Sequence, residues 1–229
     1  MPSKKFANYV KKQNKNLPEY KFGLISVIIK DPIQNDINFE YVFNKVNNLI
    51  SSHFLKLIDI VYIGDFKFFE KRQINALYAD GSLYISNDQD DNEDMLDDII
   101  HEIAHAVEEK YGQFIYSDGE IENEFLFKRK KLKSILRDHG YEMHEYDFLK
   151  IDYDEKFDFF LYKDVGYDIL NLITVNLFAN PYSATSLQEY FATGFEEYYL
   201  NDRVDLKRTS SYLYNKIVSL EEEIYENEY

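Results

Sequence analysis

The chain of 229 residues, 45% hydrophobic and 17% aromatic, can bury a sizeable core as one large domain or as two lobes. Its formal net charge of −16 argues against nucleic-acid binding, and the absence of cysteine excludes disulfide bonds and thiolate-bound zinc. Because no run of 18 apolar residues is present and residues 1–10 lack the apolar segment of a signal peptide, we expect a cytoplasmic protein that binds neither nucleic acid nor a membrane.

Strands and helices alternate in the first part of the chain. Short β-branched runs predict strands, apolar residues at three- and four-residue steps predict a helix, and Asp80-Gly81 is typical of a tight hairpin turn. The predicted elements are a strand at 24–29, a helix at 39–57, a strand at 58–63 and a hairpin formed by 74–78 and 82–85. This order, followed by further helices, indicates an α+β fold with a mixed sheet.

A helix is predicted next, over residues 95–108. Apolar side chains recur there at three- and four-residue steps. Asn92 is suited to be its N-cap, and Gly112 is a candidate stop signal.

This helix carries the motif His101-Glu102-Ile103-Ala104-His105. Two histidines four residues apart lie about one turn apart on one helical face, so both imidazoles can reach a single zinc ion. Glu102 lies beside them as a candidate general base. The alternative is an ordinary helical surface that happens to carry His101 and His105.

A catalytic zinc ion needs a third protein ligand. One common continuation of the motif, with a glycine and a third histidine, is excluded because Glu108 and Tyr111 occupy those places. A carboxylate from a second helix is the other common solution, and the best segment for it is 181–199, helical from Leu187 onward. Weaker candidates are Glu196 and Glu197 in that segment, and Glu120, Glu122 and Glu124 in a charged, loop-like stretch.

The segment 181–199 also carries a resemblance. Tyr182 precedes Glu189 by seven residues, and Glu189 opens an E-x-F-A helix. Together with the HExxH motif, this pattern resembles the protease domain of anthrax lethal factor and the clostridial Pro-Pro endopeptidases, which are gluzincin-type zinc proteases. The resemblance implies one zinc ion per chain bound by His101, His105 and Glu189. It implies that Glu102 activates water, that Tyr182 donates its hydroxyl to the oxyanion, and that the substrate is a protein or peptide.

The resemblance extends upstream of the motif. Residues 79–87 are predicted to form an edge strand shortly before the helix that carries the HExxH motif. In zincins such a strand pairs with the substrate backbone. The resemblance therefore implies substrate-binding roles for Gly81, Ser82, Leu83 and Tyr84.

A zincin-like organisation follows from the same resemblance. An N-terminal lobe, residues 1–112, would hold the mixed sheet and end in the HExxH helix. A mostly helical C-terminal lobe, residues 113–229, would carry the third ligand. The interval from His105 to Glu189 is longer than the family leads us to expect, and we interpret residues 115–175 as an insertion.

Glu189 and the residues before His101 have alternative roles. Ser186-x-x-Glu189 fits a capping box, whereas Thr185-x-x-Gln188 fits the same pattern one residue earlier and leaves Glu189 free for metal. Asp97 and Asp98 lie one turn before His101 and are expected to be solvated.

The basic cluster of the chain spans residues 127–133 and continues toward Gly140, which predicts a basic helix. It is either a solvated face or a docking surface for an acidic partner or for the acidic remainder of this protein. At the level of function, two hypotheses stand beside the protease: a catalytically inert zincin-fold binding module, and a structural zinc site closed by a fourth protein ligand.

Overall fold

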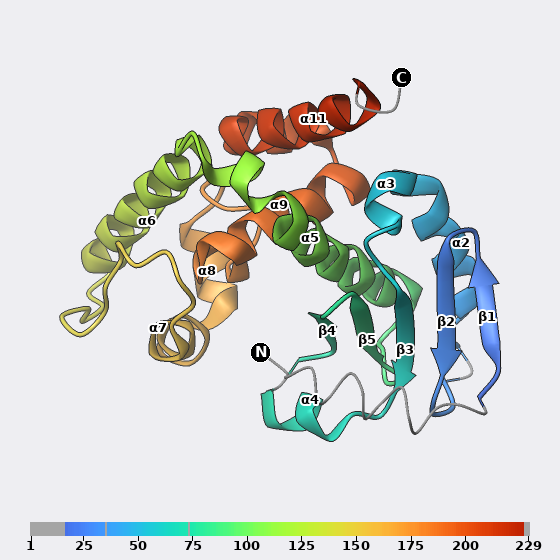
Figure 1. Cartoon of the computed structure of the whole chain (residues 1–229). Helices are drawn as coiled ribbons and strands as arrows, with labels where there is room; N and C mark the ends of the chain where they lie inside the picture. The colour runs from blue at the N-terminus through green and yellow to red at the C-terminus, as the bar shows by residue number, and fades with distance from the viewer. Residues whose placement is uncertain (1–16, 35, 73, 227–229) are drawn as a thin grey trace. The chain divides into compact units, whose positions relative to one another are not determined.

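The computed structural model describes residues 17–34, 36–72 and 74–226 (Figure 1). Residues 1–10, on which the expectation of no signal peptide rests, lie outside these ranges. The chain divides into two compact units, Met1–Lys110 and Tyr111–Tyr229, two residues before the boundary expected from the sequence. Among the described residues, no helix combines the length and apolarity needed to cross a bilayer.

The first unit is built on a mixed five-stranded sheet with the order β1-β2-β3-β5-β4. Strands β2, β3 and β5 are parallel, whereas β1 and β4 pair antiparallel to their neighbours. The α+β class expected from the sequence is confirmed. The strands are β1 (Glu19–Phe22), β2 (Ile25–Ile29), β3 (Ile60–Gly64), β4 (Ala76–Ala79) and β5 (Ser82–Ser86).

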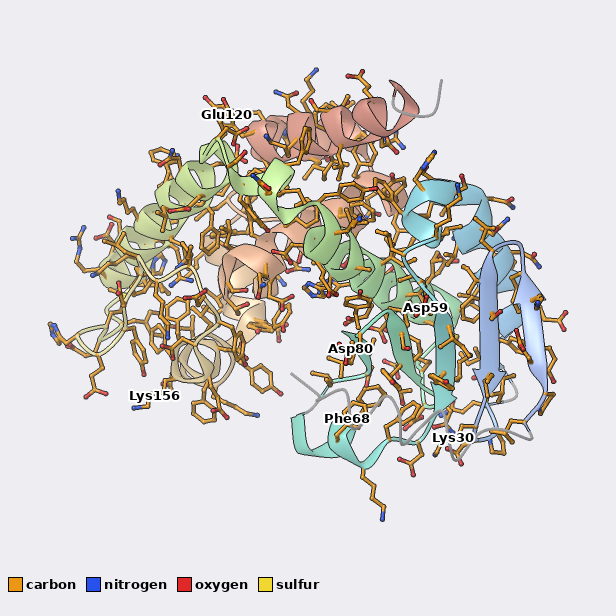
Figure 2. All side chains as sticks on the ribbon, in the orientation of Figure 1. Lys30, Asp59, Phe68, Asp80, Glu120 and Lys156 are labelled. Carbon is orange, nitrogen blue, oxygen red and sulfur yellow. The ribbon has the colours of Figure 1, made fainter. Side chains whose placement is uncertain are left out.

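The two faces of the sheet are both apolar. Alternate residues of a strand point to opposite faces, so Tyr62 and Tyr84 share one face, where their rings stack with centroids 5.5 Å apart. Helix α4 (Lys67–Arg72) adds Phe68 and Phe69 to this cluster, and Phe68 is labelled in Figure 2. The opposite face is formed by fully buried aliphatic residues: Val27, Val61, Ile63, Leu83 and Ile85.

The hairpin between β4 and β5 is the one predicted from Asp80-Gly81. Both residues have positive φ, 49° and 77°, as a two-residue hairpin turn of this type requires. Glycine suits position 81 because its φ is positive, and a Cβ there would also lie 2.9 Å from a carboxylate oxygen of Asp59. Asp59 and Asp80 are labelled in Figure 2.

The prediction of an edge strand at 79–87 is wrong. Strand β5 lies between β3 and β4, so both of its edges are hydrogen-bonded within the sheet. The predicted substrate-binding residues Ser82, Leu83 and Tyr84 are at most 1% exposed, and Gly81 belongs to the turn. The edge strand on this side of the sheet is β4.

The helix predicted over 39–57 is two helices, α2 (Phe39–Leu49) and α3 (Ser52–Leu55). The chain becomes extended at Ile50, with ψ 134°, and the hydroxyl of Ser51 accepts a hydrogen bond from the N–H of His53. A local capping side chain therefore restarts the helix where the apolar spacing alone suggested continuity.

The HExxH helix is α5 (Asn92–Tyr116), longer than predicted. Its first turn is capped by Asp91, whose carboxylate accepts from the N–H groups of Glu93 and Asp94, instead of by Asn92. Gly112 does not end it, because the apolar face continues to the fully buried Ile115, and a helical glycine costs only about 1 kcal/mol.

The second unit is helical, as expected for the C-terminal lobe, and α11 packs against α6, α9 and α10. A Cβ on Gly194 of α9 would lie 2.2 Å from Cδ2 of Leu213 on α11, so glycine permits the close approach of these two helices. The elements are α6 (Glu120–Asp138), α7 (Glu155–Phe159), the π-helical turn η1 (Phe160–Gly166), α8 (Tyr167–Ile173), the 3-10 turn η2 (Tyr182–Ala184), α9 (Leu187–Leu200), α10 (Arg203–Thr209) and α11 (Ser211–Glu226).

Helix α6 changes two sequence-based interpretations. The stretch containing Glu120, Glu122 and Glu124 is its first turns instead of a loop. The basic cluster lies on its middle turns but is not uniformly solvated, because Lys128 and Arg129 are 4% and 1% exposed. The basic run is therefore partly an element of the core of the second unit.

Candidate metal centre

Helix α5 brings His101, Glu102 and His105 together. One ligand atom from each lies within 4.8 Å of the others, and the two imidazole rings have centroids 5.0 Å apart. Both histidines are partly exposed, whereas Glu102 is 8% exposed. The i, i+4 spacing thus produces the geometry that the motif predicted.

A buried carboxylate stands behind His105. Oε2 of Glu108 lies 3.5 Å from Nδ1 of His105, and the Glu108 side chain is 9% exposed. A carboxylate at Nδ1 fixes the tautomer and orientation of an imidazole and leaves Nε2 for a metal. The position of Glu108 one turn after His105 is the signal in the sequence for this role.

Glu102 is tied to the edge of the sheet. Its Oε2 accepts a 2.5 Å hydrogen bond from the main-chain N–H of Tyr78 on β4. Ser86 donates its N–H to the carbonyl of Asn75, and Tyr78 is registered with Leu83. In an antiparallel pair, only every second residue of a strand hydrogen-bonds to the partner strand. Asn75 is such a residue, and Tyr78 is an odd number of positions further along, so the N–H of Tyr78 points to the open edge.

The phenol of Tyr78 contacts the same helix further along. Burial raises its pKa, and a hydrogen bond with the carboxylate of Glu109 raises it further. Glu102 and Glu109 are about two helical turns apart. Strand β4 is therefore fastened to α5 at two points, one of them the candidate general base.

Asp98 is not simply solvated, contrary to expectation. Its carboxylate accepts a 3.0 Å hydrogen bond from the amide of Gln89, and the side chain is partly buried. Burial raises the pKa of Asp98 to about 7, and the charges of Asp94 and Glu102 add to this rise. Asp97, by contrast, is exposed.

The donor set of this cluster fits zinc. Two imidazoles with a carboxylate beside them are the ligand types of catalytic zinc sites, and a carboxylate behind one imidazole is their usual support. Within the part of the chain that the structure describes, this is the only group of three such side chains close enough to hold a metal ion.

The remaining predicted residues, Tyr182 and Glu189, lie in the second unit. Ser186 is the N-cap of α9, and its hydroxyl accepts a 3.1 Å hydrogen bond from the N–H of Glu189, so the cap is Ser186 and not Thr185. Tyr182 is partly buried on η2. Burial is the largest cause that raises the pKa of Tyr182, and the negative charge of Glu189 is the second. The two side chains therefore lie in one electrostatic environment.

A buried arginine holds the segment between Tyr182 and Glu189. The guanidinium of Arg129 donates to the carbonyls of Ala184 at 2.6 Å and Thr185 at 3.3 Å, and to that of Asp147 at 3.1 Å. Burial lowers its pKa to about 10, so it stays charged at neutral pH. Three aromatic rings surround it: Phe125, Phe148 and, at 3.9 Å, Phe157.

The predicted insertion also contributes to this region. Leu187 donates its N–H to the carbonyl of Ile151 at 2.8 Å. Asp158 accepts hydrogen bonds from the hydroxyls of Tyr153, at 2.6 Å, and Tyr167, at 3.1 Å. Burial raises the pKa values of both tyrosines, and the Glu189 charge is among the further causes. Part of the predicted insertion, residues 115–175, thus contacts the start of α9, a role that the sequence did not reveal.

Comparison with family models, with curated proteins and with solved structures found no match for this chain. The likeness to lethal factor-type proteases therefore remains a resemblance carried by two motifs. The geometry around His101, Glu102 and His105 is the feature of the structure that points to a function.

Proposed function

We propose that this protein is a zinc-dependent endopeptidase of the gluzincin type with a zincin-like fold. The observation that supports it best is the arrangement on α5, where two imidazoles and Glu102 converge. The buried Glu108 behind His105 and the link from Glu102 to the edge strand add support.

In this proposal His101, His105 and Glu189 hold one zinc ion. Zinc in such a site acidifies a water molecule and polarises a carbonyl group. Glu102 accepts a proton from the attacking water and delivers it to the leaving amine. Tyr182, whose phenol carries its proton at neutral pH, donates a hydrogen bond to the oxyanion of the tetrahedral intermediate.

The substrate backbone is proposed to pair with β4 (Ala76–Ala79) instead of with β5. Strand β4 is an edge strand, so its outward main-chain groups can add a further strand. The N–H of Tyr78 is one of these groups, and here it is bonded to Glu102. A protein or peptide bound in an extended conformation would compete for that N–H.

Zinc content is the first test. Elemental mass spectrometry on protein purified without metal affinity should give about one zinc per chain. Glu189→Ala should lose the zinc, whereas the matched variant Glu196→Ala on the same helix should keep it. If both variants kept their zinc, Glu189 would not be a ligand, and a structural site closed by another ligand would be favoured. No zinc in the parent, even after incubation with zinc, would favour the inert binding module.

Activity is the second test. Cleavage of casein should depend on zinc and should vanish in Glu102→Gln, while the zinc content stays at the parent level. The unchanged metal content separates a lost base from a lost site. Cleavage that persists in Glu102→Gln would refute the assignment of Glu102 as general base.

A further inference from the structure

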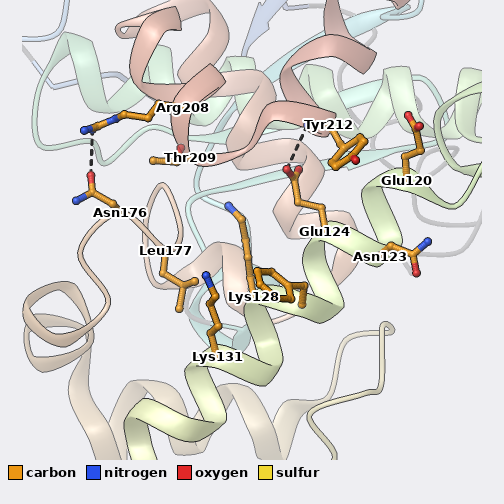
Figure 3. Close-up of a pocket in the computed structure, with 11 residues that line it drawn as sticks. Glu120, Asn123, Glu124, Lys128, Lys131, Asn176, Leu177, Arg208, Thr209 and Tyr212 are labelled. Carbon is orange, nitrogen blue, oxygen red and sulfur yellow. Dashed lines mark hydrogen bonds between the residues drawn. The ribbon is translucent and has the colours of Figure 1, made fainter.

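A groove of about 500 Å³ lies in the second unit, among α6, the loop at 176–177, α10 and the start of α11 (Figure 3). Three cationic side chains line it: Lys128, Lys131 and Arg208. Apolar surface comes from three others: Phe127, Leu177 and Tyr212. The volume falls within the range of small-ligand sites, although the groove is open on one side.

Lys128 is the buried cation of the groove. It is 4% exposed, and its Nζ donates a 2.6 Å hydrogen bond to the hydroxyl of Ser210. The rings of Tyr190 and Phe178 lie 5.0 Å and 5.6 Å from Nζ. An ammonium has three donors, so one hydroxyl leaves donor capacity for a further acceptor. Burial lowers the pKa of Lys128 to about 8, and the charge of Glu124 offsets part of this fall.

Glu124, the carboxylate of the lining nearest to Lys128 along α6, already accepts hydrogen bonds from other groups. The carboxylate of Glu124 accepts from the hydroxyl of Tyr190 at 3.0 Å and from the N–H groups of Tyr212 and Leu213 at 3.2 Å and 3.1 Å. These two N–H groups belong to the first turn of α11, whose positive end favours a carboxylate. Glu124 therefore acts as a helix cap, and its charge is only partly available to the lysine.

Two exposed cations complete the basic side of the groove. Figure 3 shows the side chains of Lys128 and Lys131 extending in the same direction from α6, with Arg208 across the groove beside Asn176. Arg208 donates to the side-chain oxygen of Asn176 at 3.0 Å and pairs with Asp205 at 2.9 Å. The lining also holds the carboxylates of Glu120 and Glu124, so its three cations outnumber its two anions in a chain of net charge −16.

We propose that this groove binds a small organic anion, with its oxyanion group at Lys128, Lys131 and Arg208 and its apolar body against Leu177 and Tyr212. The inference uses only residues of the second unit and does not depend on the proposed zinc chemistry. The shared chemistry is an oxyanion on an apolar body, whether that oxyanion is a phosphate or a carboxylate.

The test is calorimetric titration of the whole chain with phenyl phosphate, with benzoate and with neutral benzamide. At least one anion should bind saturably and benzamide should not, and the anion that binds identifies the oxyanion. Lys131→Gln and Arg208→Gln, at exposed positions that do not threaten folding, should each weaken binding several-fold, and Lys128→Met about tenfold or more. Lys130→Gln, an exposed lysine on the same helix, is the control.

A second readout addresses Lys128 directly. An anion at its amine raises the lysine pKa, so binding near pH 8 should take up protons, seen as heats that depend on the ionisation enthalpy of the buffer. Proton uptake should vanish in Lys128→Met. Absence of saturable binding by either anion, equal binding of benzamide, or an equal effect of Lys130→Gln would overturn the proposal.

Discussion

The main-chain N–H of Tyr78 donates a hydrogen bond to the carboxylate of Glu102, so the candidate general base is fastened to the edge of the sheet. The bond orients the carboxylate on the same helical face as His101 and His105. In the proposed function, a substrate strand at this edge would take over the N–H and release the carboxylate for proton transfer. The proposed base and the proposed substrate position would then be linked through one peptide group.

Amide hydrogen exchange can test this link. Glu102→Ala should speed exchange of the Tyr78 N–H, because an outward edge-strand amide without its acceptor is open to water. Glu102→Gln should retain part of the protection, since the amide oxygen can still accept. The amide of Leu77, which points to β5 in the same register, is the internal reference. Unchanged exchange at Tyr78 in Glu102→Ala would show that the bond does not persist in solution.

Glu108 should govern metal affinity without being a ligand. Glu108→Gln replaces the carboxylate at Nδ1 of His105 with a neutral amide and should weaken zinc binding roughly 10- to 100-fold. Competition with a fluorescent zinc chelator measures this affinity. Glu93→Gln, which changes an exposed carboxylate in the first turn of the same helix, is the control and should bind zinc as the parent does. Equal affinity in all three proteins would contradict a supporting role for Glu108.

Arg129 should be essential for the stability of the second unit. Arg129→Met removes the donor to three main-chain carbonyls in a buried setting and should lower the free energy of unfolding by roughly 2–5 kcal/mol in urea titrations. Arg129→Lys should recover only part of this loss, because an ammonium cannot span the three acceptors as a planar guanidinium does. Arg137→Met, exposed on the same helix, should stay within about 0.5 kcal/mol of the parent.

Lys128 should make stability rise with pH. Its pKa is about 8 in the folded chain against 10.5 in the reference state, so between these values the unfolded chain binds more protons and alkalinity favours folding. The unfolding free energy of the parent minus that of Lys128→Met should rise by about 2 kcal/mol from about pH 7 to about pH 10. In this difference the contributions of the other titrating groups to the unfolding free energy cancel, because both proteins share them. A flat difference would mean that Lys128 is solvated in the folded state.

Local signals gave the most reliable predictions of the fold. The Asp80-Gly81 turn and the amphipathic face of α5 depend on neighbouring residues, and both are present. Strand β1 (Glu19–Phe22) was missed because it is mostly exposed and exists through its pairing with β2. The identity of the edge strand was missed for the same reason, since the parallel pairing of β5 with β3 is a long-range contact.

In the candidate site, too, features set by neighbouring residues could be predicted and those set by long-range packing could not. The histidine pair of α5 could be read from spacing, and the support by Glu108 could have been. The burial of Lys128 and Arg129 was hidden within a basic run, although Phe125 and Leu132 flank them at helical steps. Counting those apolar neighbours would have placed both cations inside the buried stripe of α6. The alternatives at Thr185 and Ser186 fit the capping pattern equally well, so the sequence could not choose between them.

The bond between Glu124 and the first amides of α11 bears on how this protein can be shortened. Deleting the carboxyl-terminal helix from Ser211 onward would strip Glu124 of two of its donors. It would also take Leu213 away from Gly194 of α9, and Glu221 away from the hydroxyls of the buried residues Tyr198 and Tyr199. A version trimmed for crystallisation should therefore keep α11 whole. A protease that nicks the chain before Ser211 should produce an aggregating fragment instead of a smaller stable one.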